Sequence, residues 1–146
     1  MIKRATLLCL PILLMSCSST APPDAEASKA YLEKAAAMPG AVRTPSGLIY
    51  RELRPGTGTS PRATDTVKVN YRGTLIDGKK FDSSENIKFP LNQVIPCWTE
   101  GVQKMKVGGK SELVCPASIA YGTQGQPPDI PGGATLIFEI ELLGIG

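Results

Sequence analysis

The sequence predicts an α+β domain in which a mostly antiparallel sheet is covered by one short helix. From about Ala41 onward, most apolar residues recur with a period of two, as in strands with one buried face. Only one interior stretch has helical spacing. The 146 residues, of which 42% are hydrophobic, suit a single globular domain with short additions.

Residues 1–16 predict a secretory signal. Lys3 and Arg4 form a short positive segment, and the apolar run that follows is too short for a permanent membrane span. Leu14, three positions before Cys17, resembles the lipobox of bacterial lipoproteins, in which the cysteine is lipidated. The alternative is an ordinary signal peptide that contains a cysteine. The resemblance implies a bacterial cell-envelope protein that is anchored to the membrane through Cys17. In that family an aspartate directly after the lipidated cysteine keeps the protein in the inner membrane. Ser18 occupies this position here, which favours the outer membrane, with the domain facing the periplasm.

Two short segments precede the domain. Residues 17–27 are small, polar and proline-containing, so we expect a flexible tether. Residues 28–40 predict a helical extension, with Ser28 as the N-cap, a helix over 29–38 and a stop at Pro39-Gly40. We expect this helix to dock on the domain, and contact with a partner is the alternative.

The strands of the domain, residues 41–146, are predicted from their alternation. The expected extended segments are 48–53, 67–76, 81–84, 89–91, 112–115 and 135–143. The last of them is the clearest, because four apolar residues from Leu136 to Leu142 point one way and two glutamates the other. Asp77-Gly78 predicts a hairpin turn.

One interior helix and one long loop complete the domain. A single apolar stripe is formed by Trp98, Val102 and Met105, which fall at i, i+4 and i+7. Pro96, just before this stripe, suits the start of a helix. Residues 122–133 contain four glycines and three prolines around Ile130. A loop of this length is usually functional or disordered, so we predict an ordered flap over a site. An inert hairpin loop is the alternative.

The composition excludes several chemistries. Histidine is absent, which removes a histidine base, a His-ligated metal and a Ser-His-Asp triad. The formal charge of +3 includes Lys3 and Arg4, so the mature chain is nearly neutral and has no nucleic-acid footprint. We therefore expect no cofactor, no metal and no nucleic-acid partner.

Six aromatic residues are spread over different elements. They are Tyr71, Phe81, Phe89, Trp98, Tyr121 and Phe138. A ligand pocket collects rings from many elements in this way, but aromatic residues also dominate ordinary cores. The sequence leaves both interpretations open.

A series of motifs resembles the FKBP-type peptidyl-prolyl isomerases over residues 41–146. The matching segments are VKVNYRGTL at 67–75, DG at 77–78, FDSS at 81–84, VIP at 94–96, WTEG at 98–101, AYG at 120–122, IP at 130–131 and ATLIFE at 134–139. YLEK at 31–34 and SGL at 46–48 further resemble the bacterial periplasmic branch that is related to macrophage infectivity potentiators. The resemblance implies a five- to six-stranded antiparallel sheet wrapped around one short helix, with the active site between them.

The resemblance also implies a role for each matched residue. Trp98 would form the pocket floor, and its walls would be Tyr71, Phe81, Phe89 and Phe138. Val94 and Ile95 would line the rim, with the Ile95 N–H holding a substrate carbonyl, and Ile130 would be the flap contact. The catalytic positions would be Tyr71, Asp82 and Tyr121. A turn-capping Asp82 and a purely structural Tyr121 are the alternatives.

Two cysteines remain in the domain once Cys9 is removed with the signal and Cys17 is lipidated. Cys97 opens the predicted helix, and Cys115 faces inward on the strand expected beneath it. In an oxidising compartment this even pair predicts a disulfide. Two buried free thiols are the alternative.

Three functions compete at this stage. The first is a lipid-anchored prolyl isomerase that acts on proline-containing polypeptides of the envelope. The second is a chaperone or binding module that uses the same pocket, and the third is a structural lipoprotein with a decayed domain. Macrolide inhibitors are candidate ligands of the pocket. We expect a monomer and leave a dimer open, because only a short stub matches the relatives' dimerisation helix.

Overall fold

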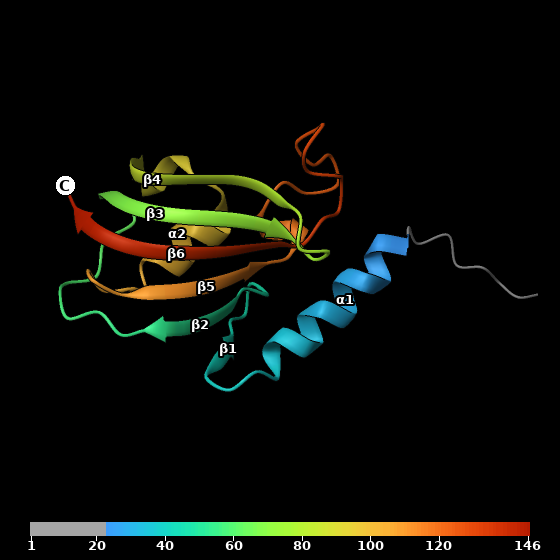
Figure 1. Ribbon diagram of the computed structural model, residues 1–146, viewed down its shortest axis with the longest axis horizontal. Coiled ribbons are helices and arrows are strands. Elements are labelled where there is room, and N and C mark those ends of the chain that lie inside the picture. Colours follow the sequence, from blue (N-terminus) through green and yellow to red (C-terminus); the bar gives the residue numbers. More distant parts are fainter. Residues whose placement is uncertain (1–22) are drawn as a thin grey trace, which may run out of the picture.

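The protein folds as a six-stranded antiparallel sheet with a short helix on its inner face and a longer helix on its outer face (Figure 1). The computed structural model describes residues 23–146. The strand order is β1-β2-β5-β6-β3-β4, and every neighbouring pair is antiparallel. The predicted α+β class and the five- to six-stranded sheet are confirmed.

The C-terminal strand lies in the interior of the sheet, between strands from both halves of the chain. The elements are α1 (Pro23–Ala36), β1 (Ala41–Arg43), β2 (Ile49–Arg54), β3 (Thr66–Leu75), β4 (Lys80–Pro90), the 3₁₀ turn η1 (Leu91–Gln93), α2 (Pro96–Val102), β5 (Lys110–Cys115), the 3₁₀ turn η2 (Ala117–Ile119) and β6 (Leu136–Ile145). Because β6 pairs with both β3 and β5, it brings the two halves of the domain together.

Helix α1 packs on the outer face of the sheet, as expected, but its bounds differ from the prediction. It begins at Pro23, six positions early, and ends at Ala36. Proline suits the first helical turn because its missing N–H would be unpaired there. Ser28, the predicted N-cap, is buried inside the helix. Tyr31 and Ala35 pack against the sheet, so tertiary contacts hold this helix in place.

Most of the N-terminal predictions fall outside the described residues. These are the signal at 1–16, the lipidation site Cys17 and the tether up to residue 22. Residues 23–27 of the predicted tether belong to α1. No helix in the described part of the chain is long and apolar enough to cross a membrane.

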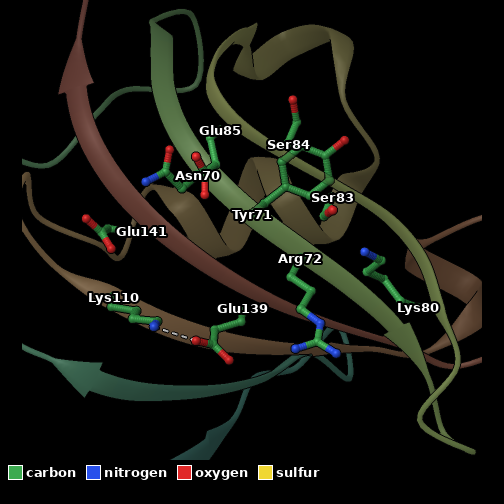
Figure 2. Close-up of a pocket in the computed structure, with 10 residues that line it drawn as sticks. All are labelled: Asn70, Tyr71, Arg72, Lys80, Ser83, Ser84, Glu85, Lys110, Glu139 and Glu141. Atoms are coloured by element: carbon green, nitrogen blue, oxygen red, sulfur yellow. Dashed lines mark ion pairs between the residues drawn. The ribbon is translucent and has the colours of Figure 1, made fainter.

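The outer face of the sheet has an apolar part and a charged part. Ile49, Val114 and Ile137 form the apolar part, and α1 covers it. The charged part is a shallow hollow of about 640 Å³ over β3, β4, β5 and β6 (Figure 2). Within it the Lys110 ammonium lies 2.5 Å from a Glu139 carboxylate oxygen.

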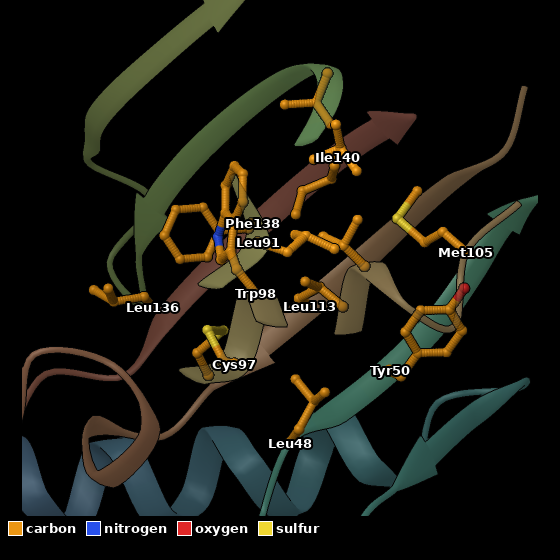
Figure 3. Packing of buried hydrophobic residues seen from close by; sticks show 14 of the residues in the cluster. Leu48, Tyr50, Leu91, Cys97, Trp98, Met105, Leu113, Leu136, Phe138 and Ile140 are labelled. Carbon is orange, nitrogen blue, oxygen red and sulfur yellow. A yellow bond between two sulfur atoms is a disulfide. The ribbon is translucent and has the colours of Figure 1, made fainter. Parts of the chain in front are cut away.

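The inner face carries the main core (Figure 3). Along β6 the four apolar residues from Leu136 to Leu142 are buried, whereas Glu139 and Glu141 face the outer side. Helix α2 adds Cys97, Trp98 and Val102 to this core, and Met105 follows just after the helix. The burial of the three predicted apolar residues is therefore confirmed, but the helix is shorter than their spacing predicts, because it ends at Val102 and Met105 lies beyond it.

Candidate functional site

A cavity of about 530 Å³ opens between the inner face of the sheet, helix α2 and the segment after η2. This volume lies within the range of small-molecule and peptide side-chain sites. The cavity is lined by Tyr71, Phe81, Asp82, Ile87, Phe89, Gln93, Val94, Ile95, Trp98, Tyr121 and Phe138. All six aromatic residues that the sequence singled out therefore line one cavity.

Trp98 is the centre of an aromatic cluster. Its ring is 4% exposed and lies edge-on to three others, with centroid distances of 5.1 Å to Tyr71, 5.4 Å to Phe89 and 5.3 Å to Phe138. Edge-to-face pairs of this kind are favourable. The indole Nε1 is buried and has no hydrogen-bond partner among the described residues. The floor of the cavity is thus a buried aromatic ring whose only polar atom is this indole N–H.

A glycine in β3 allows two of the rings to approach each other. A Cβ atom added at Gly73 would lie 2.5 Å from the Phe81 ring and 3.0 Å from the Phe138 ring. These rings are in edge contact, with centroids 5.6 Å apart. A side chain at position 73 would therefore push Phe81 or Phe138 out of the cavity wall.

One polar pair lies at the cavity wall. The Tyr71 hydroxyl donates a hydrogen bond of 2.6 Å to Asp82 Oδ2. Burial, followed by this hydrogen bond and the charge of Asp82, raises the pKa of Tyr71 well above 10. Burial, followed by the charge of Asp82, also raises the pKa of Tyr121. Both hydroxyls therefore stay protonated and able to donate at neutral pH.

A bulge in β4 places Asp82 beside Tyr71. Val69 pairs with Ile87, but Tyr71 pairs with Ser84, so β4 has one extra residue between these positions. Asn86 lies in the bulge with φ +53°, and its N–H donates to Asn70 Oδ1 at 2.8 Å. On a regular strand Asp82 and Ile87 would face opposite sides because they are five residues apart. The bulge allows both to line the cavity.

The rim is formed at the start of α2. The Ile95 carbonyl accepts hydrogen bonds from the N–H groups of Trp98 and Thr99. The N–H of Ile95 makes no backbone hydrogen bond within residues 23–146. It is therefore free to donate to a bound carbonyl group, as the resemblance implies.

A disulfide fixes the beginning of α2 to the sheet. Cys97 and Cys115 are bonded, with Cα atoms 5.9 Å apart and both side chains fully buried. Because Cys97 precedes Trp98, this bond holds the first turn of the helix next to the cavity floor (Figure 3).

The site contains two residues that the sequence analysis missed. Ile87 lies two residues before Phe89, so the period of a strand already places both on one face. Gln93 directly precedes the predicted rim residue Val94. Both signals were present in the sequence, but neither residue is aromatic and both were passed over.

The structure places Ile130 differently from the other predicted site residues. It is 4% exposed, belongs to the main core and does not line the cavity. Its backbone forms two hydrogen bonds with Gln126, which close the tip of the loop. Ile130 thus anchors the flap, and its contact with a bound chain stays a prediction.

The arrangement can bind a compact apolar group with a small number of polar contacts. The carboxylate of Asp82 already accepts the Tyr71 hydroxyl. Among the described residues, no group of three or more histidine, cysteine or acidic side chains could hold a metal ion. The cavity therefore offers apolar contact with its rings, and hydrogen bonding by the tyrosine hydroxyls and the Asp82 carboxylate.

Comparison with known proteins identifies relatives of this chain. Residues 57–143 match the family model of FKBP-type peptidyl-prolyl cis-trans isomerases. An "FKBP-type peptidyl-prolyl cis-trans isomerase FkpA" from Aeromonas hydrophila is 53% identical over 119 residues, which are 79% of this chain and 44% of the relative. The "Outer membrane protein MIP" of Legionella longbeachae is 44% identical, over 80% of this chain and 52% of the relative. The chain thus spans about half the length of these two relatives.

A solved structure has the same fold. The crystal structure of a peptidyl-prolyl cis-trans isomerase from Pseudomonas syringae has a TM-score of 0.81 and 40% sequence identity to this chain. The match covers 86% of this chain and 97% of the other.

Proposed function

Because this chain belongs to the family of FKBP-type peptidyl-prolyl cis-trans isomerases, we propose that it accelerates cis–trans rotation of X–Pro bonds in polypeptides. The observation that carries the proposal is the edge-to-face cluster of rings around the buried Trp98, with the Tyr71–Asp82 pair at its wall. This cavity has the volume and apolar lining that a prolyl ring and its neighbouring residues require.

The reaction needs a shaped apolar site rather than a nucleophile. Rotation about a peptide bond has a barrier of ~18–20 kcal/mol because resonance keeps the amide planar. For X–Pro bonds cis and trans are close in energy, but exchange takes tens to hundreds of seconds. A dry pocket disfavours the charge-separated planar form, and contacts that fit only the twisted form lower the barrier. A thousandfold acceleration corresponds to ~4 kcal/mol.

The polar groups orient the bound chain in this proposal. The Ile95 N–H holds one substrate carbonyl at the rim, and the protonated Tyr121 hydroxyl is a second donor. Asp82 fixes the Tyr71 hydroxyl, and therefore the ring, against Trp98. The prolyl ring packs against the side chains of Trp98, Phe89 and Phe138.

The test is the isomerisation rate of proline peptides with the purified mature chain. Exchange between cis and trans is followed by NMR line shapes or by coupling to a protease that cleaves only the trans form. We expect catalysis at substoichiometric enzyme, reduced by Trp98→Leu but not by a change on the outer face such as Glu139→Gln. A rate equal to the uncatalysed one would reject the isomerase.

A binding module is the second candidate, because the same cavity would hold proline-containing segments without turning them over. Binding of a proline peptide with no acceleration of exchange would select this function. Macrolide inhibitors are ligands of the cavity in either case, and their competition with the peptide tests whether the two share it.

We further propose that the mature chain is a monomer anchored by a lipid on Cys17 to the outer membrane of a bacterial envelope, with its domain in the periplasm. The lipobox-like residues support this proposal. The name of the Legionella relative, an outer membrane protein, also supports it. Mass spectrometry of the N-terminal peptide tests the lipid, and membrane fractionation of Cys17→Ala tests the anchor. A sedimentation measurement of the purified chain decides between monomer and dimer.

A further inference from the structure

Helix α2 depends on its neighbours for its orientation. It has seven residues, and no side chain caps its N-terminus. A helix this short has little stability of its own, so tertiary contacts determine how it is rotated about its axis. Trp98 extends from this helix to the cavity floor, so any rotation of α2 moves the indole.

Contacts hold α2 on two of its sides, the side toward β5 and the side toward η1. Toward β5, the Cys97–Cys115 disulfide is joined by Gly101, where an added Cβ would lie 2.6 Å from a Leu113 methyl group. Toward η1, the Thr99 hydroxyl donates to the Leu91 carbonyl at 2.6 Å. Neither contact holds the side of the helix that faces away from the cavity.

Within residues 23–146, one side-chain hydrogen bond holds that remaining side. Ser46, in the turn between β1 and β2, donates to Glu100 Oε2 at 2.5 Å. Each helical residue advances by about 100°, so Glu100 lies about 200° around the helix from Trp98, on nearly the opposite side. A carboxylate acceptor makes this bond stronger than one between neutral groups.

The turn that carries Ser46 is suited to hold the helix. The hydroxyl oxygen of Ser46 lies 2.8 Å from the hydroxyl oxygen of Thr44. The turn is closed by backbone hydrogen bonds from Gly47 to Thr44 and from Thr44 to Leu48, and Leu48 is fully buried in the core. Ser46 itself is exposed, so burial does not explain its contact with a residue 54 positions away.

We propose that Ser46 and Glu100 are positioning residues, whose hydrogen bond holds α2 in the rotation that presents the Trp98 ring to the cavity. The expected effect on the rate rests on the proposed isomerase function, whereas the expected effect on the orientation of Trp98 does not. Neither residue lines the cavity, so both act through Trp98. Small displacements of a group that must fit a transition state are costly in rate.

The first experiment removes the donor. For Ser46→Ala we expect kcat/KM for a proline peptide to fall about three- to tenfold, as for loss of one charge-assisted hydrogen bond. Ser46→Thr keeps a hydroxyl and should restore most of the rate. Trp98 is the only tryptophan of the chain, so its fluorescence emission and its quenching by acrylamide directly report the environment and the solvent exposure of the cavity floor. Both should change in Ser46→Ala and return in Ser46→Thr.

The second experiment separates positioning from stability. Glu112→Gln removes the charge from a half-buried carboxylate that accepts from Arg51 at 3.2 Å on the outer face, so it is the matched control. It should leave the rate and the Trp98 quenching unchanged. Glu100→Ala should behave as Ser46→Ala does, and the double variant should lose no more than either single one. Glu100→Gln keeps an acceptor and should lose less.

The outcomes are distinct. Wild-type rate and quenching in folded Ser46→Ala and Glu100→Ala would overturn the proposal, as would an equal loss in Glu112→Gln. If the wild-type chain shows no acceleration at all, the isomerase function fails. The quenching comparison still decides whether Ser46 and Glu100 position Trp98.

Discussion

Two hollows of this protein lie on opposite faces of one sheet and share strands β3, β4 and β6, yet their linings differ in chemistry. They meet at Tyr71, which lines both. The outer hollow is larger, at about 640 Å³ against 530 Å³, and charged side chains dominate its lining (Figure 2). Lys110 and Glu139 pair within it, and both are well exposed to solvent. The inner cavity is built on Trp98 and Phe138, which are 4% and 3% exposed.

This difference indicates that the volume of a hollow does not by itself identify the proposed site. Water solvates the charges of the outer hollow and weakens their interactions. The inner cavity has buried rings at its floor. In the proposed isomerase, contacts with these rings would distinguish a twisted from a planar peptide bond. The five predictions below test this contrast.

The largest effect is expected in the cavity wall. Phe138→Ala removes a buried ring that contacts Trp98 and Phe81, so the free energy of unfolding should fall by about 3–5 kcal/mol. The isomerase rate should fall about a hundredfold, or ~2.7 kcal/mol. Chemical unfolding and peptide exchange measure the two quantities. Phe138→Leu should lose less of both, and a fully active Phe138→Ala would contradict the role of the ring.

The next effect concerns the disulfide beneath the floor. Replacing Cys97 and Cys115 by serine removes a cross-link between residues 18 positions apart. The free energy of unfolding should fall by about 3 kcal/mol in the chain-entropy model. Unfolding of the wild type with and without a reductant gives an independent measurement. Equal stability in both conditions would be inconsistent with a disulfide that stabilises the fold.

A smaller effect is expected at the polar pair. Tyr71→Phe keeps the ring but removes its hydrogen bond to Asp82, so the rate should fall by about tenfold. Stability should change by only about 1 kcal/mol, because Tyr71 is partly exposed. Steady-state kinetics measures the loss, and Asp82→Asn, which keeps an acceptor, should lose less than Asp82→Ala. Unchanged kinetics in Tyr71→Phe would limit that residue to packing.

The pH dependence of stability follows from the same tyrosine. Its pKa is raised above 10 in the fold, so at alkaline pH the folded chain keeps a proton that the unfolded chain releases. The stabilisation from this proton is complete below pH 10 and is lost as the pH rises above 10. Urea unfolding at several alkaline pH values should show a steeper loss in the wild type than in Tyr71→Phe. Parallel curves would contradict the raised pKa.

The smallest effect is expected in the outer hollow. Glu139→Gln weakens the contact with Lys110, but the free energy of unfolding should change by less than about 0.5 kcal/mol. The rate should stay at the wild-type value. Any rate loss comparable to that of Tyr71→Phe would mean that the two faces of the sheet are coupled.

Much of the fold could be predicted because its signals are local. The alternation along β6 reports one buried face, and the i, i+4 spacing of Trp98 and Val102 reports helix α2, although Met105 at i+7 lies beyond its end. The N-terminus of α1 could not be placed in this way, because Ser28 has the residue type of an N-cap but lies buried within the helix, which begins at Pro23. The flap tip was predicted as ordered, but the burial of Ile130 depends on the core beneath it.

The candidate site was largely predictable in membership, apart from Ile87, Gln93 and Ile130, but not in geometry. The six rings and Asp82 were named from the sequence, and the cavity lining contains all of them. Their distances and partners come from strand register and helix orientation. The hydrogen bond from Ser46 to Glu100, for example, joins positions that no period or motif relates.

The amino-acid order alone determined which faces are apolar, where turns occur and which side chains are available for chemistry, since each depends on residues within a few positions. Only the tertiary structure decided which of those side chains meet. The extra residue at Asn86 in β4 turns Asp82 to the same face as Ile87, beside Tyr71. That bulge depends on a hydrogen bond from its backbone to Asn70 on the neighbouring strand, a contact that exists only once β3 and β4 have paired.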